Sequence, residues 1–133
     1  MAPITNEAEA CAAILVACRL ADEISPEAES PLLRLVISTR NVFLGCDPDE
    51  LLRTAEARFA EAGSPEALID AAAGGVRAQS RLPLLYHCLD VILSNGLVTP
   101  REHQIFQHLR GKFRIQDKVA FQAMEVLTVK NLL

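Results

Sequence analysis

Two short polar segments hold the residues whose types and spacing could do chemistry. The segment SNGLVTPREHQIF, residues 94–106, places a Gly six residues before a Glu. This spacing fits the second half of a calcium-binding EF-hand loop, where Gly is sixth and Glu is twelfth. With Gly96 at position six, Glu102 falls at position twelve. Val91 and Leu93 then occupy positions one and three, where calcium requires carboxylates, so the ligand count argues against an EF-hand.

The same segment also has the pattern of a connection between two helices. Thr99 is followed by Pro100, and Glu102 stands three residues after the Thr, which is the spacing of a helix-capping box. Asn95 and Gly96 precede this start and suit a helix C-terminus, because both residue types tolerate a positive φ. Local physics alone therefore predicts a helix–turn–helix connector here.

A second polar segment, ADEISPEA at residues 21–28, follows the first apolar run. Asp22 and Glu23 stand where a helix would end, and Ser25 with Pro26 could begin the next one. Two carboxylates at a helix C-terminus oppose its dipole by roughly 0.3–1 kcal/mol each. The simpler interpretation is that both are solvated, and the alternative is that they belong to a site.

The elements that must position these residues are all helical. Ala- and Leu-rich apolar stripes recur at helical spacing, and a Ser, Thr or Asp followed by Pro marks several helix starts. No segment alternates in the manner of a strand. We expect an all-α fold, a compact single-domain bundle of about seven helices, at residues 7–21, 26 or 31 to 43, 48–62, 65–73, 81–94, 100–113 and 117–131.

The second of these helices has two candidate starts. Ser25-Pro26 would leave Pro31 inside the helix, where it removes a hydrogen bond, whereas Ser30-Pro31 would not. Either start places an apolar stripe at the same positions: Leu32, Leu35, Val36 and Phe43.

We expect residues 1–133 to form one domain, because this length suits one hydrophobic core. The segments CRLADEISPEA and VILSNGLVTPRE align, each with an apolar helix, a short turn and a capped helix start. The alignment predicts two helical pseudo-repeats at about 7–62 and 81–131, joined by a linker helix at 65–73.

The run from an aliphatic helix through Ala-Asp-Gly-x-Ile/Val-Ser-Pro-x-Glu into a further helix resembles the TerB-like family, which is named for a tellurite-resistance protein. Residues 94–102 match this run, and residues 21–28 match it less closely. With the duplicated hairpin, the resemblance covers most of the chain. It implies a small, non-enzymatic bacterial domain that acts in tellurite resistance or stress response by binding a protein partner.

The resemblance also implies a divalent-cation site at the acidic turns. Carried over by position, Asp22 takes the acidic turn position, Asn95 its counterpart and Glu102 the acidic helix start, with Glu23 beside them. Asn95 stands where the family has an Asp, and a hard cation binds more weakly as carboxylates are lost. No other cofactor is expected.

The remaining polar residues do not form a catalytic arrangement in the sequence. His103 and His108 are five apart, which is not the spacing of a zinc-binding helix pair, and His87 beside Cys88 lacks a third group. The basic segment RGKFRIQDK at 110–118 is best interpreted as a cationic helix C-terminus followed by a solvated turn. We expect no enzyme activity.

Composition limits the class of partner. The net charge is −4, with −8 in residues 1–70 and +4 in residues 71–133, which argues against nucleic acid. The apolar run ACAAILVAC is about half of what a membrane span requires. The four cysteines form no C-x-x-C pair and predict buried free thiols in a reducing cytoplasm: Cys11, Cys18, Cys46 and Cys88.

Two function hypotheses follow. The first is the TerB-like, partner-binding stress-response module with a divalent cation at its acidic turns. The alternative is a purely structural protein-interaction or homo-oligomerisation module, in which the turns are helix caps and hold no metal. A DNA-binding helix–turn–helix that uses residues 100–113 ranks below both, because the chain is acidic.

Overall fold

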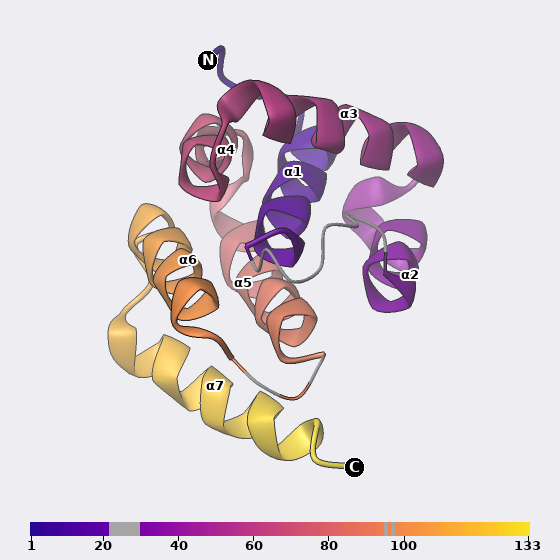
Figure 1. Cartoon of the computed structure of the whole chain (residues 1–133). Coiled ribbons are helices and arrows are strands. Elements are labelled where there is room, and N and C mark those ends of the chain that lie inside the picture. The colour runs from indigo at the N-terminus through magenta and orange to yellow at the C-terminus, as the bar shows by residue number, and fades with distance from the viewer. Residues whose placement is uncertain (22–29, 95, 97) are drawn as a thin grey trace.

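The computed structural model describes residues 1–21, 30–94, 96 and 98–133 (Figure 1). These residues form seven α-helices and two 3₁₀ turns, with no strand among them. The all-α prediction is therefore confirmed. The α-helices are α1 (Glu7–Arg19), α2 (Pro31–Thr39), α3 (Pro48–Ala62), α4 (Pro65–Ala72), α5 (Ala78–Leu93), α6 (Pro100–Lys112) and α7 (Asp117–Lys130), and the 3₁₀ turns are η1 (Asn41–Phe43) and η2 (Ala73–Gly75).

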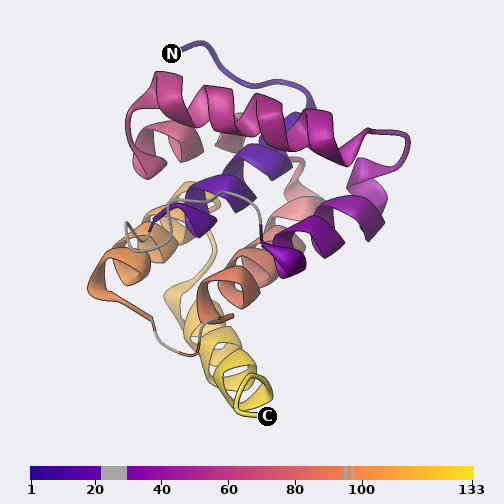
Figure 2. The same cartoon turned by 45° about the vertical axis from the view of Figure 1, so that its right-hand side comes forward.

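Helix α1 is the centre of the molecule. Every residue from Ala10 to Cys18 is buried, on all sides of the helix. A helix that is apolar all round has to be covered all round, and α1 packs against α3, α4 and α5. Figure 1 shows α1 enclosed by these helices, and in both views α3 and α7 lie at opposite ends of the molecule (Figure 2). None of the described helices is both long and apolar enough to cross a membrane.

The helix starts follow the predicted capping chemistry. Asp47, Ser64 and Thr99 each accept a hydrogen bond from a backbone N–H in the first turn, and a Pro follows each of them. Helix α2 begins at Pro31, where Ser30 Oγ accepts from Leu33 N at 3.1 Å. The alternative start at Ser25 and Pro26 lies outside the described residues.

Helix α2 corrects the predicted apolar stripe. Leu35 is 58% exposed, whereas Leu33 and Ile37 are fully buried. The helix also ends at Thr39, and η1 replaces its predicted last turn. Five of the nine residues of this short helix are Leu, Val or Ile. More than one face therefore satisfies helical spacing, and only packing against the rest of the fold decides which face turns inward.

Helix α5 begins three residues before its predicted start. It opens at Ala78, so Pro83 lies inside the helix instead of near its start. The sequence shows no capping side chain here, and the N-cap residue Arg77 makes no side-chain cap. Its backbone N–H instead donates to Glu7 Oε2 at 2.8 Å, a contact 70 residues away that no local pattern predicts.

The first residues of the chain are held against η2. Ile4 is buried, and its N–H donates to Ala71 O at 2.9 Å. Gly75 lies so close that a Cβ built on it would be 2.2 Å from Ile4 O. The absence of a side chain at Gly75 therefore lets this segment approach the backbone of η2.

The two halves share an order of contacts. Helix α1 contacts α2 and α3, α5 contacts α6 and α7, and α1 contacts α5. This order agrees with two related helical units that meet through their first helices. The internal repeat and the domain boundaries remain predictions, because the turn 22–29 on which the alignment depends lies outside the described residues.

Candidate functional site

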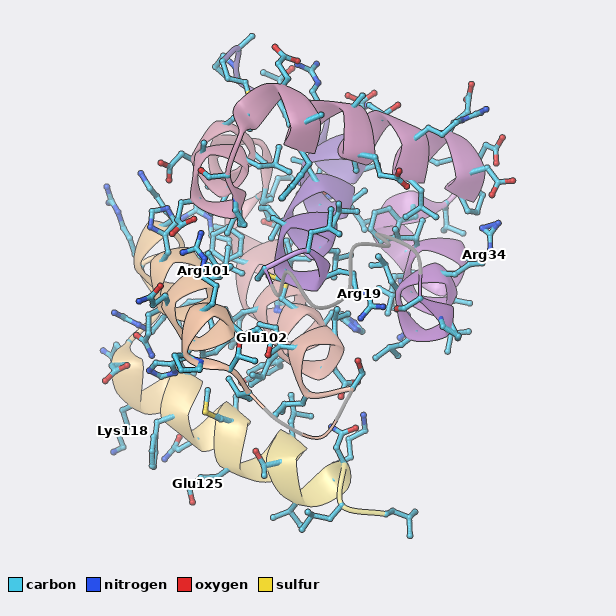
Figure 3. All side chains as sticks on the ribbon, in the orientation of Figure 1. Arg19, Arg34, Arg101, Glu102, Lys118 and Glu125 are labelled. Atoms are coloured by element: carbon cyan, nitrogen blue, oxygen red, sulfur yellow. The ribbon has the colours of Figure 1, made fainter. Side chains whose placement is uncertain are left out.

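Of the four predicted cation ligands, the structure describes only Glu102. Asp22, Glu23 and Asn95 lie outside the described residues. Glu102 is buried, with 4% of its surface exposed, and it is the one charged side chain that is buried in the part of the chain described. Figure 3 shows it on the side of α6 that faces α5.

The buried carboxylate of Glu102 is engaged in a capping box. Its Oε1 accepts a hydrogen bond from Thr99 N at 2.9 Å, and Thr99 Oγ1 accepts from Glu102 N at 3.1 Å. The backbone N–H groups of Thr99 and Glu102 would otherwise be unpaired at the start of α6. The capping prediction is confirmed. Within residues 1–21, 30–94, 96 and 98–133, no three His, Cys, Asp or Glu side chains are grouped to hold a metal ion.

The residue next to the cap ties α6 to α4. Arg101 forms a two-armed ion pair with Glu66, with distances of 2.6 and 2.7 Å. The hydrogen bonds from Arg101 lower the pKa of the Glu66 carboxyl, although burial opposes the shift. One helical turn further along α4, Asp70 Oδ1 contacts His108 Nε2 at 2.7 Å and Lys112 Nζ at 3.3 Å.

The basic segment at 110–118 has its two leading cations bound within the molecule. Lys112 pairs with Asp70, and Arg110 donates to Ile115 O at 2.8 Å and lies 3.5 Å from Asp117. Arg110 and Lys112 occupy the last turn of α6, where cations suit the dipole. This geometry agrees with the predicted helix C-terminus.

Three of the four thiols are buried, as predicted. Cys11 and Cys18 on α1 and Cys88 on α5 belong to the core, and burial raises the pKa of Cys11 to about 12. The prediction was wrong for Cys46, which is exposed in the turn between η1 and α3. A turn offers no helix face to turn inward, so the thiol faces solvent.

The outward face of α7 carries several exposed apolar side chains. Helix α7 buries only Ala120 and Ala123, two small residues. Phe121, Val126 and Val129 are 63%, 67% and 68% exposed. Five of the nine large apolar side chains that are exposed among the described residues lie between positions 121 and 133. This concentration differs from the singly scattered apolar residues that are normal on protein surfaces.

Two opposite charges lie on this face. Lys118 and Glu125 are seven residues apart, which places them on one side of α7 two turns from each other. Figure 3 shows both pointing away from the rest of the molecule. Neither has an ion-pair partner in the described part of the chain. We call Lys118, Phe121, Glu125, Val126 and Val129 the α7 surface.

Sequence reasoning did not identify the α7 surface. Helical spacing places Val119, Ala123, Met124 and Leu127 on one face of α7, and in the structure Ala123 is buried and the other three are half-buried. The available signal was the excess of apolar residues in 119–133, more than one helix face can bury.

Comparison of the chain with protein-family models, with curated proteins and with solved structures finds no match in any of the three. The fold and its surfaces therefore define a helical bundle with an exposed apolar helix. The resemblance to the TerB-like family stays a prediction that rests on residues 21–28 and 94–102.

Proposed function

We propose that this chain is a non-enzymatic helical interaction module whose partner is a second copy of itself, bound through the α7 surface. The observation that carries the proposal is the exposure of Phe121, Val126 and Val129 on a helix whose only buried residues, among those described, are Ala120 and Ala123. Fully burying one such side chain contributes roughly 1.5–3 kcal/mol. Pairing two copies would bury the same set twice.

The charges on the α7 surface favour a second copy over an unrelated partner. A twofold axis that crosses α7 beside Phe121 runs the two helices antiparallel. Lys118 of each copy then faces Glu125 of the other, because the two residues lie on opposite sides of the axis at similar distances. A surface that is complementary to itself in this way suits an isologous dimer.

The apolar and charged groups have different roles in this arrangement. An exposed ion pair is worth about 0.2–1 kcal/mol, less than the burial of one large apolar side chain. The apolar residues would therefore supply most of the affinity. The two ion pairs would select the antiparallel register, because a parallel pairing places Lys118 opposite Lys118.

Charge reversal tests this dimer. Sedimentation velocity from micromolar to millimolar protein should show a monomer–dimer equilibrium. Glu125→Lys and Lys118→Glu should each weaken dimerisation, because each replaces two attractive pairs with two repulsive ones. The double variant with both reversals restores opposite charges, and it should return the dissociation constant to near that of the parent chain.

A matched control is Glu56→Lys on α3, which makes the same charge change on an exposed residue at the other end of the molecule. It should leave the dimer unchanged. A chain that is monomeric throughout this range would contradict the proposal. So would a double variant no better than the single ones, since it restores both the net charge and the opposite pairing, and the losses would then not come from the Lys118–Glu125 pairs.

Tellurite resistance, stress response and a divalent cation remain predictions of the family resemblance. The cation is tested by titrating the protein with Ca²⁺, Mg²⁺ or Zn²⁺ and following its NMR spectrum. Unshifted signals of Asp22, Asn95 and Glu102 at millimolar metal would contradict a cation site at the acidic turns.

A further inference from the structure

A second feature of the molecule is separate from the α7 surface. A cleft of about 220 Å³ opens between α1, α5 and the segment that runs from the end of α2 through η1. No charge lies on its inner wall, and the lining there is apolar: Cys11, Leu15, Val36, Val42, Phe43 and Leu84. The wall comes from three parts of the chain, so the cleft exists only in the folded protein.

The rim of the cleft is polar and carries one permanent positive charge. Arg40, Asn41, Gln79, Ser80 and His87 line it, and no carboxylate does. The Arg40 side chain is exposed and donates one long hydrogen bond, from Nε to Thr39 Oγ1 at 3.4 Å. In the described part of the chain it has no ion-pair partner. The cation is therefore available to a ligand at the mouth of an apolar cleft.

We propose that this cleft binds a small monocarboxylate with an aliphatic body of about six carbons, its carboxylate on Arg40 and its chain against the inner wall. The volume sets the size, because at about 30 Å³ per water it equals roughly seven waters and falls below the usual range for drug-sized ligands. The charge sets the head group, because a guanidinium pairs with a carboxylate through two parallel hydrogen bonds.

His87 gives the site a spectroscopic signature. Burial, with the positive charges of Arg40 and Lys130, lowers the pKa of His87, and Asp90 acts in the opposite direction. The remaining titratable group of the wall is the Cys11 thiol, with a pKa of about 12, so it stays neutral. A carboxylate bound at the rim adds a negative charge beside His87 and should raise its pKa. Binding and protonation of His87 should therefore favour each other.

Hexanoate is a suitable probe, with hexanamide as its uncharged counterpart. Titration of hexanoate into the full chain, followed by NMR, should shift signals of the cleft residues and move the His87 titration to higher pH. Hexanamide should bind more weakly. Arg40→Gln should lower the affinity for hexanoate by about tenfold or more, because the substitution removes a charge-assisted hydrogen bond. Asn41→Asp adds a negative charge to the rim and should also lower the affinity for hexanoate.

The matched control is Arg53→Gln, which removes an exposed arginine of α3 that does not line the cleft. It should leave hexanoate affinity unchanged. Equal binding of hexanoate and hexanamide would overturn the proposal, and so would an Arg40→Gln variant with the affinity of the parent chain. Cleft signals that do not move at millimolar hexanoate would overturn it as well.

Discussion

At the scale of single residues, Glu102 shows how one side chain can satisfy two interpretations of a sequence. Its position fits the last ligand of a cation loop and also the third residue of a capped helix. In the structure its carboxylate is buried and accepts the Thr99 N–H, so the capping role is present without any ion. The Thr-Pro-Arg-Glu spacing was enough to predict this, because a capping box depends only on residues within one turn.

Two substitutions at Glu102 separate capping from cation binding. Glu102→Ala removes the acceptor for a backbone N–H and should lower the free energy of unfolding by about 0.5–2 kcal/mol, measured by urea denaturation. Glu102→Gln keeps an amide oxygen at the same place, which a capping box accepts, and should cost much less.

Measuring the free energy of unfolding with and without metal then distinguishes the two roles. If capping alone operates, adding Mg²⁺ or Ca²⁺ changes neither variant relative to the parent chain. A Glu102→Gln variant that matches the parent without metal, but loses a stabilisation that metal gives the parent, would instead support the cation site.

At the scale of the elements, helix ends were predictable where their chemistry is local. Asp47, Ser64 and Thr99 start the helices expected of them, since a cap and a following Pro act within one turn. The start of α5 was missed because the backbone N–H of its N-cap residue, Arg77, donates to Glu7, which lies 70 residues earlier in the sequence. Of the predicted stripe, Val36 and Phe43 are buried, but Leu35 is exposed in place of Leu33 for a related reason, since only packing distinguishes Leu33 from Leu35.

The Gly74-Gly75 pair supplies a matched test of packing between elements. Gly75→Ala would place a Cβ 2.2 Å from Ile4 O, a backbone atom that moves only if the first residues of the chain move. We expect a loss of about 1–3 kcal/mol in unfolding free energy. Gly74→Ala meets nothing within 4 Å and should be nearly neutral.

Thermal and urea denaturation of both variants decide this prediction. Equal stability of Gly75→Ala and Gly74→Ala would mean that the segment before α1 is not held against η2. An amide exchange measurement adds a local readout, because the Ile4 N–H should lose protection in Gly75→Ala alone.

At the scale of the whole molecule, the uneven charge of the sequence has a structural counterpart. The acidic first half and the basic second half are joined by ion pairs that cross between them: Glu7 with Arg77, Glu66 with Arg101, and Asp70 with Lys112. The imbalance is visible in the sequence but the pairing is not, because the pairs join residues 35 to 70 positions apart. The α7 surface was equally hidden, since exposure is a property of the assembled fold.

These cross-half pairs predict sensitivity to acid. Hydrogen bonds from Arg77 and Arg101 lower the pKa values of Glu7 and Glu66 below 4.5. A carboxyl with a lowered folded-state pKa stabilises the fold fully above the unfolded value, and this stability is lost as pH falls through the folded value. Unfolding free energy should therefore decline below about pH 4.5.

Glu66→Gln isolates one of these pairs. Above pH 5 it should cost about 0.2–1 kcal/mol, because the pair is partly exposed, and at pH 3 or below it should cost little. The measurement is urea denaturation across this pH range. A penalty that is the same at both ends would mean that the charge of Glu66 contributes nothing.

Helix α1 has a consequence for how the protein is made. It is buried on every side by α3, α4 and α5, yet all three follow it in the chain. On a ribosome that adds roughly 5–20 residues per second, α1 emerges before these three helices and waits on the order of seconds for the last of them. During that interval Ala10–Cys18 is an apolar helix without cover. We therefore expect the emerging chain to be most prone to aggregation before α5 is complete, a risk that follows from the order of the helices alone.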